Sequence, residues 1–441
     1  MFALSEISTD ALVAPTRGGD WDDNGAWRQI HVHTWDPIHV EVRDAWNSLL
    51  SNVYNCNQVI YNNGSAANVL EARFLIAFYY YNVIDFFGQT PYRDQGTDIN
   101  DDAKVWTRTE ATNFVISELE AILPSFPART VNDASTANKD AAHFLLAKLY
   151  LNKAVFTSAN PAGPYTFAAA DMTKVVQNVD AISSSLATDY WDNFKPTNNT
   201  SAEILFSSKN VRSGDGGGIQ SRWRMCQHYN QTPGGWNGFS TVAEYYNRFA
   251  ATDKRKNYSD AGTIAAFGNP AGFQVGQQYA PGGVTPLNDR NGHPLVFTPA
   301  VTMITSGATL ETAGIRAEKY IPDAVDLGAP ENDYVFFRYA DALLMKEEAI
   351  LSGGSGTSGT VLADLAARSG VTAAPNTLDG IYAERGRELW WEGWRRNDMI
   401  RFGKYLEARE LKPSVSAAKY VLLPIPAAAL LNPNLKQNDG Y

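Results

Sequence analysis

The chain has 441 residues, of which 44% are hydrophobic and 19% charged, and this balance excludes disorder for most of its length. The 37 basic and 47 acidic residues give a net charge of −10, which argues against a general nucleic-acid binder, because phosphate neutralisation needs clustered cations. The two cysteines, Cys56 and Cys226, exclude a disulfide scaffold and a cysteine-rich zinc module. We expect two unpaired thiols, with a single disulfide as the alternative.

No run approaches the roughly 18 to 20 consecutive apolar residues that span a bilayer. The first ten residues, MFALSEISTD, have neither a basic start nor a long apolar core, so they do not have the pattern of a signal peptide. The composition is unusual in its aromatic content, with 11 Trp, 21 Tyr and 20 Phe.

Helical periodicity dominates both ends of the chain. Apolar residues three and four apart predict helices over 66–87, 110–123, 140–156, 334–351 and 378–401. Gly88 follows the first of these as a natural stop, and Thr109 is a candidate N-cap of the second. The mixture of small and aromatic residues suits closely stacked helix pairs, as in tetratricopeptide-type repeats, although no clean 34-residue period is present.

The middle of the chain, residues 188–333, is rich in Gly, Pro, Asn and Asp and has only short strand-like runs such as 203–207. Glycine clusters at 213–218 and 233–235 predict loops. Because the region also carries many aromatic residues, which disordered linkers avoid, we expect an ordered, loop-rich surface on a helical scaffold. Residues 352–360 contain no aromatic residue and are typical of a flexible connector.

The usual catalytic patterns are weak or missing. Glu384, Glu388 and Glu392 share a helix face, but neighbouring arginines favour an intrahelical ladder of ion pairs over catalysis. His31 and His33 form a His-x-His pair that would lie on one face of a strand, yet hydrogen-bonded structural histidines are favoured over a metal site. Nucleophile-elbow and nucleotide-binding motifs are absent. We therefore expect no catalytic residue, no metal and no cofactor.

Tryptophans on polar loops are the remaining signal. A sugar ring presents an apolar face that stacks on Trp or Tyr, whereas its hydroxyls need polar side chains at the edge. Segments 17–27 and 223–239 combine both ingredients. The alternative is that each of these rings fills the core beneath a loop. The predicted stacking residues are Trp21, Trp27, Trp106, Trp223 and Trp236, and the predicted polar contacts are Asp20, Asp22 and Asn237.

Several motifs resemble the SusD/RagB family, in the order in which that family carries them. They are 68–81 (NVLEARFLIAFYYY) with 86–91 (FFGQTP), 338–349 (RYADALLMKEEA), 384–398 (ERGRELWWEGWRRND), and 423–426 (LPIP) with 432–438 (NPNLKQN). Segments 15–21 (PTRGGDW) and 234–239 (GGWNGF) also recur in many members, which extends the resemblance over almost the whole chain. Gly386 and the Trp390–Trp391 pair depart from the usual motif but are tolerable in a helix.

The resemblance implies a mostly α-helical fold, in which about four tetratricopeptide-like helix pairs support a loop-rich, irregular part with short β hairpins. We expect one SusD-like domain over 1–441, with a helical scaffold at 1–187, a ligand-side region at 188–333 and a C-terminal helical segment at 334–441. The conserved-looking motifs would belong mainly to the scaffold, since members of the family reshape their ligand loops.

The resemblance also implies a function. SusD-like proteins are non-catalytic, surface-exposed outer-membrane lipoproteins of Bacteroidetes that capture glycans for a SusC-like TonB-dependent transporter. Members start with a signal peptide and a lipidated cysteine, whereas 4–10 (LSEISTD) matches an early family segment almost at once, so we expect the natural N-terminus to lie ahead of Met1. The alternatives are peptide capture, as in the RagB branch, an α-helical glycoside hydrolase, and a purely structural scaffold.

Overall fold

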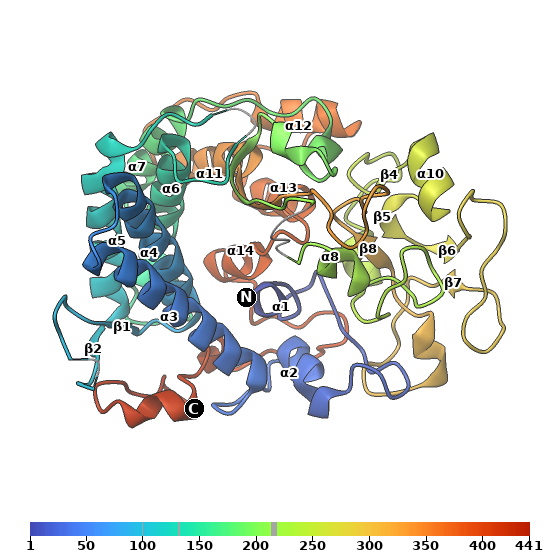
Figure 1. Ribbon diagram of the computed structural model, residues 1–441, viewed down its shortest axis with the longest axis horizontal. Coiled ribbons are helices and arrows are strands. Elements are labelled where there is room, and N and C mark those ends of the chain that lie inside the picture. Colours follow the sequence, from blue (N-terminus) through green and yellow to red (C-terminus); the bar gives the residue numbers. More distant parts are fainter. Residues whose placement is uncertain (99, 131–132, 213–217) are drawn as a thin grey trace.

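A curved wall of helices supports an irregular part built from loops and short strands. The computed structural model describes residues 1–98, 100–130, 133–212 and 218–441, and most of the predicted glycine loop at 213–218 lies outside these residues. Figure 1 shows α3 to α7 along one side of the molecule, α13 and α14 in its middle, and β4 to β8 on the other side. The mostly helical fold class predicted from the sequence is confirmed.

The helical wall is a series of neighbouring helices, each packed on the next. α3 packs on α4, α4 on α5, α5 on α6, α6 on α7, α7 on α11, and α11 on α13. The helices span α1 Phe2–Glu6, α2 Ala26–Val32, α3 Val40–Tyr61, α4 Ala66–Phe86, α5 Arg108–Ile122, α6 Lys139–Phe156, α7 Ala169–Asp180, α8 Ser221–Arg224, α9 Ala243–Tyr246, α10 Ala261–Phe267, α11 Tyr339–Leu351, α12 Val361–Ser369, α13 Leu378–Glu388 and α14 Arg395–Arg401. Neighbouring helices bury aromatic and small residues against each other, among them Phe74, Tyr81 and Phe144.

Local signals set the ends of the early helices. The Ser65 hydroxyl accepts a hydrogen bond from the Asn68 amide at the start of α4, and Gly88, with φ of 77°, follows its end. A capping box between Thr107 and Glu110 starts α5, so Thr107, rather than the predicted Thr109, is its N-cap. The predicted helices over 66–87, 110–123 and 140–156 are therefore confirmed to within two residues at each end.

The two later helix predictions are each partly wrong. Residues Tyr334–Arg338 form strand β9, which pairs with β3, and helix α11 begins only at Tyr339. The strand depends on a partner more than 120 residues earlier, which a local pattern does not show. The predicted helix over 378–401 is broken between α13 and α14, where Trp391 has φ of 57° and Gly393 has φ of 86°.

The middle of the chain is ordered and loop-rich, as predicted. Its short strands form small antiparallel sheets, with β4–β5–β8, β6–β7 and β3–β9 as neighbours, while β1 pairs with β2 in the scaffold. The strands span β1 Thr90–Tyr92, β2 Lys104–Trp106, β3 Ile204–Ser208, β4 Asn257–Tyr258, β5 Ala271–Gln274, β6 Gly276–Gln277, β7 Val296–Phe297, β8 Arg316–Glu318 and β9 Tyr334–Arg338.

The connector at 352–360 is hydrogen-bonded to the scaffold rather than free along its length. The Ser355 amide donates to Thr173 Oγ1 on α7, and the Gly359 amide donates to Glu347 Oε1 on α11. Among the described residues, no helix is long and apolar enough to cross a membrane.

Candidate functional site

The loop that carries Trp21 and Trp27 is held in place by a buried arginine. Arg17 Nε donates to Gly238 O at 3.1 Å, and its terminal nitrogens reach Ala313 O at 2.9 Å and Ser240 Oγ at 3.1 Å. Burial holds the pKa of Arg17 well below its usual value. One side chain thus ties segment 17–25 to the loop that contains Trp236.

The same loop has an unusual backbone. Trp21, Asp23 and Asn24 have φ angles of 61°, 40° and 53°. These values lie in the left-handed region, which residues other than glycine rarely adopt. Such conformations persist only where the surrounding structure fixes them, and they gather at ligand-binding sites. Trp21 therefore stands on a loop whose shape is set by its contacts rather than by local preference.

Three aromatic rings form a cluster at this place. The Trp21 and Trp27 ring centroids are 5.5 Å apart, and Phe239 lies 5.1 Å from Trp21 and 5.5 Å from Trp27. Trp21 Nε1 donates to Trp236 O at 2.6 Å, and Trp27 Nε1 donates to Asp23 Oδ2 at 2.5 Å. Both tryptophans are half-buried, so each ring is oriented by packing and by a hydrogen bond while part of it stays open to solvent.

Gly238 is required beneath this cluster. A Cβ atom on Gly238 would lie 2.2 Å from Cε2 of Trp21, a distance that side chains do not tolerate. Gly235 has a separate reason, because a Cβ atom there would lie 2.3 Å from Gln227 O, so both glycines of this turn are required by close backbone approach.

Trp236 is the open part of the surface, with 44% of its area exposed. Its amide donates to Arg224 O at 2.5 Å, and the next two amides donate to Gln227 O at 2.7 Å and Met225 O at 2.9 Å. The turn is therefore fixed by backbone hydrogen bonds, and the Trp236 ring projects from a rigid base. A rigid, exposed indole loses little conformational entropy when a ligand covers it.

A polar network borders the rings. Asp20 Oδ2 accepts from the Tyr229 hydroxyl at 2.5 Å and from Arg290 Nη1 at 3.0 Å, and the Arg290 guanidinium lies 4.3 Å from the centre of the Tyr229 ring. Burial and the hydrogen bond to Asp20 raise the pKa of Tyr229 to about 12, so its hydroxyl stays protonated. Asp22 pairs with Arg28 at 2.7 Å. These half-exposed groups are suited to hydrogen-bond the hydroxyls of a ligand.

We use the name aromatic surface for this arrangement of Trp21, Trp27 and Trp236 with Asp20 and Asp22. It brings together five of the eight residues predicted as ligand contacts, from segments that are about 200 residues apart. Sequence reasoning missed Arg290, because nothing in the turn that contains it signals a contact with Asp20. Tyr229 and Arg17 lay in the predicted segments but were not singled out.

Two predicted contacts are corrected by the structure. Trp223 is fully buried in the core, with 0% of its area exposed, so its ring offers no face to a ligand. Asn237 is also buried, where Oδ1 accepts from Arg316 Nη2 at 2.7 Å and Nδ2 donates to Glu311 O at 2.9 Å. Neither residue therefore forms part of the aromatic surface.

Trp106 lies elsewhere. Figure 1 shows β2, which ends at Trp106, at the edge of the helical wall, whereas the aromatic surface lies on the side of α2 and the loop-rich part. The Trp106 ring is stacked between Tyr92, at 3.8 Å and 9°, and Phe114, at 4.4 Å and 29°. It also lines a cavity of about 860 Å³ together with Arg108, Asn160 and Lys436. Trp106 thus packs against Tyr92 and Phe114 while part of it lines this cavity, and it lies apart from the aromatic surface.

The carboxylates that a glycosidase would use are already engaged. Glu388 pairs with Arg338 at 2.6 Å, with Arg255 at 3.0 Å, and with Arg368. Glu388, Arg338 and Arg255 are buried, and the Arg368 side chain is only 4% exposed. Although burial alone would raise it, the three arginines hold the pKa of Glu388 below its usual value. The predicted intrahelical ladder is limited to Arg387–Glu384, since the other partners come from distant segments.

The histidine cluster is structural, as favoured from the sequence. However, the His-x-His pair does not lie on a strand: His31 lies on helix α2, and His33 is the C-cap of that helix. His33 Nε2 lies 2.8 Å from Ser8 O, His31 Nδ1 lies 3.2 Å from Ile7 O, and His39 Nε2 lies 3.1 Å from Ala26 O. Within the described ranges, no three His, Cys, Asp or Glu side chains are grouped to hold a metal ion. Cys56 and Cys226 are both free thiols, as predicted.

Comparison with known proteins places these features in a family. The sequence model described as the SusD family matches residues 177–415. The starch-binding protein SusD of Bacteroides thetaiotaomicron is 25% identical over all of this chain and 85% of its own length. This chain therefore spans most of that relative, from the early motifs to the C-terminal ones.

Two solved structures show the same fold at low identity. A SusD superfamily protein from Parabacteroides distasonis is similar with a TM-score of 0.75 and 18% identity, covering 100% of this chain and 93% of that one. Surface glycan-binding protein A from Bacteroides thetaiotaomicron, solved in complex with laminarihexaose, has a TM-score of 0.69 and 21% identity over 99% of this chain and 93% of that one. With a family match over more than half of its residues and this shared fold, the chain belongs to the SusD family.

Proposed function

We propose that this protein binds carbohydrate without modifying it, and that the aromatic surface is its main glycan contact. The observation that carries the proposal is the exposed Trp236 indole on the turn whose carbonyl accepts from Trp21 Nε1, together with the Trp21–Trp27 ring pair and the network of Asp20, Tyr229 and Arg290. Flat apolar rings next to fixed hydrogen-bonding groups match a pyranose, which has an apolar face and a polar rim. Membership of the SusD family, and a relative named for starch binding, support this assignment.

The absence of catalysis is part of the proposal. Retaining and inverting glycosidases need two carboxyl groups that flank a substrate about 5 to 9.5 Å apart. Here the glutamates of α13 and the neighbouring loop are buried in ion pairs with arginines. A buried carboxylate that is fully paired with arginines cannot reach a glycan, and it is not available to donate or accept a proton in glycoside hydrolysis.

The cellular role follows from the family and is proposed on that basis. We propose that the chain acts as one unit over residues 1–441, is anchored through a lipid at the surface of the outer membrane, and delivers its glycan to a SusC-like TonB-dependent transporter. Co-purification of such a transporter with the tagged protein from its own cells would support this role. Recovery of the protein alone, from a fraction without outer membrane, would count against it.

A panel of glycans tests the binding proposal. Native affinity electrophoresis with amylopectin, laminarin, xyloglucan and an unrelated protein-derived peptide mixture would be run with the wild type and with Trp21→Ala. Retardation by at least one polysaccharide, reduced in the variant, is the expected result. Binding of the peptide mixture alone would favour the RagB-like alternative, and release of reducing ends from any bound glycan would show that the protein is an enzyme.

A further inference from the structure

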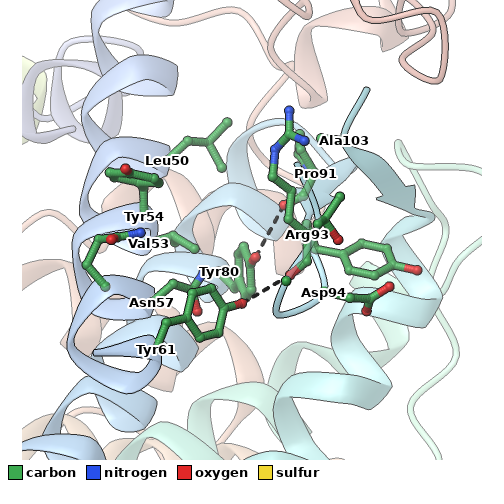
Figure 2. A pocket seen from close by; sticks show the side chains of 14 residues that line it. Leu50, Val53, Tyr54, Asn57, Tyr61, Tyr80, Pro91, Arg93, Asp94 and Ala103 are labelled. Carbon is green, nitrogen blue, oxygen red and sulfur yellow. Dashed lines mark hydrogen bonds between the residues drawn. The ribbon is translucent and has the colours of Figure 1, made fainter. Parts of the chain in front are cut away.

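Helix α3 carries a second stripe of side chains beside the face that packs on α4. The stripe follows a helical spacing of three and four residues, so its members lie along one side of the helix. Its members are Leu50, Val53, Tyr54, Asn57, Gln58 and Tyr61. These side chains line a cleft whose other wall comes from β1 and nearby residues, namely Pro91, Tyr92, Arg93, Asp94, Gly96, Thr97 and Ala103 (Figure 2).

The far wall of this cleft is held in position. The Tyr61 hydroxyl donates to Arg93 O at 3.3 Å and the Tyr80 hydroxyl donates to Pro91 O at 3.2 Å, both drawn as dashed lines in Figure 2. Tyr92 is stacked on Trp106 at 3.8 Å. The cleft is therefore preformed, and a ligand would not have to order it.

Three side chains in the cleft keep groups that the protein itself leaves available, namely Tyr54, Asn57 and Arg93. Among the described residues, Tyr54 and Tyr61 make no contact with another aromatic ring, and the Asn57 amide has no side-chain hydrogen bond. Tyr54 is 49% exposed. The Arg93 guanidinium donates only to Asp98 O, at 3.1 Å, and has no carboxylate within ion-pair distance in the described part of the chain.

The size of the cleft restricts its ligand. Its volume of about 310 Å³ is near the lower limit for small-molecule sites, which hold roughly 300 to 1,000 Å³. A protein partner would cover about 800 Å² on each side, far more than these side chains present. One or two sugar rings would fit, with an apolar face on a tyrosine and hydroxyls directed at an amide and a guanidinium.

We propose that this cleft is a second carbohydrate-binding site, which takes one or two pyranose units of a neutral glycan and is separate from the aromatic surface. Tyr54 provides the stacking face, and Asn57 and Arg93 provide the hydroxyl contacts. The inference rests on the proposed function, because it assumes that the protein meets glycans. It adds a second contact on the helical wall, so that one chain holds a long polysaccharide at two places.

Calorimetry on the full chain tests the inference, with laminarihexaose, maltohexaose and a xylogluco-oligosaccharide as probes. The aromatic surface is first disabled by Trp21→Ala with Trp236→Ala, and the residual binding is measured. We expect residual saccharide binding that Tyr54→Ala weakens at least about fivefold, since stacked rings contribute beyond their buried area. Asn57→Ala should weaken it to a similar extent through one lost hydrogen bond.

Asn55→Ala is the matched control, because Asn55 is an exposed asparagine on α3 that does not line the cleft. It should leave the residual binding unchanged. If the wild type binds one saccharide per chain, and Tyr54→Ala has no effect on it, the second site is refuted while the proposed function stands. If the wild type binds none of the probes and none of the polysaccharides in the panel, both proposals fail together.

Discussion

The exposed face of Trp236 gives the most direct estimate of what the aromatic surface contributes to binding. Trp236→Ala removes the ring but keeps the backbone carbonyl that accepts from Trp21 Nε1, so the rest of the cluster should stay in place. Because only 44% of the residue is exposed, its removal also uncovers packed area and should lower stability by about 1 to 3 kcal/mol, which the fold withstands.

The contribution of Trp236 to the binding free energy can be estimated from the exposed area of its ring. An indole presents up to about 250 Å², so an exposed fraction of 44% leaves roughly 110 Å² available, of which a flat sugar would cover about half. Burial of about 55 Å² at 25 cal/mol per Å² is worth about 1.4 kcal/mol, or a tenfold change in Kd. We therefore expect Trp236→Ala to weaken glycan binding about tenfold, and Trp236→Phe to weaken it less.

Isothermal titration of the best-binding oligosaccharide from the panel measures this change, with thermal unfolding as a check on the fold. Leu431→Ala is a suitable control, because Leu431 is a highly exposed apolar residue outside the aromatic surface. An unchanged Kd for Trp236→Ala, with the control also unchanged, would show that the ligand does not stack on this ring.

Three further predictions concern the structure beneath the site and its pH dependence. Gly238→Ala should displace the Trp21 ring, because the new Cβ would lie 2.2 Å from it; we expect weaker glycan binding, altered tryptophan fluorescence and a loss of about 1 to 3 kcal/mol of stability in urea unfolding. Glu388→Gln should lower the free energy of unfolding by about 3 kcal/mol or more, since it leaves buried arginines without their shared partner. The folded-state pKa of Glu388 is depressed, so its stabilisation is present above pH 4.5 and is lost as the pH falls; the variant should show a shallower decline in acid. Burial raises the pKa of Glu6 to about 8, so the wild type should lose stability as the pH rises from about 5 to 8, whereas Glu6→Gln should be nearly flat over that range.

Each of the three predictions for the Gly238, Glu388 and Glu6 variants would be contradicted by a specific result. A Gly238→Ala protein with native fluorescence and affinity would mean that the ring does not rest on the glycine. Equal acid unfolding of the Glu388→Gln variant and the wild type would mean that the ion pairs contribute nothing net. A Glu6→Gln variant that keeps the wild-type decline between pH 5 and 8 would assign that decline to another group.

Much of the fold could be predicted from the sequence, because helices are coded locally. The helices at 66–87 and 140–156 follow from apolar spacing and from a glycine or capping residue nearby. Strand β9 could not be predicted in this way, because its pairing partner β3 lies far away in the chain. The break between α13 and α14 depends on Trp391 in a left-handed conformation, which tertiary packing imposes against local preference.

The candidate site was partly predictable for a similar reason. Tryptophans next to glycine and asparagine marked loops that the structure brings together: the Trp21 and Trp27 rings are neighbours, and Trp21 Nε1 donates to Trp236 O. The same pattern also selected Trp223, which is buried, because a loop sequence does not show which ring turns inward. Arg290 was missed because its contact with Asp20 joins residues 270 positions apart.

A crystal structure of the protein with the best-binding oligosaccharide from the panel would show directly whether the aromatic surface holds the glycan. We expect sugar density stacked on Trp236 and the Trp21–Trp27 pair, with a hydroxyl within hydrogen-bonding distance of Asp20 or Arg290. An ordered saccharide bound elsewhere, with the aromatic surface left open to solvent, would contradict this expectation.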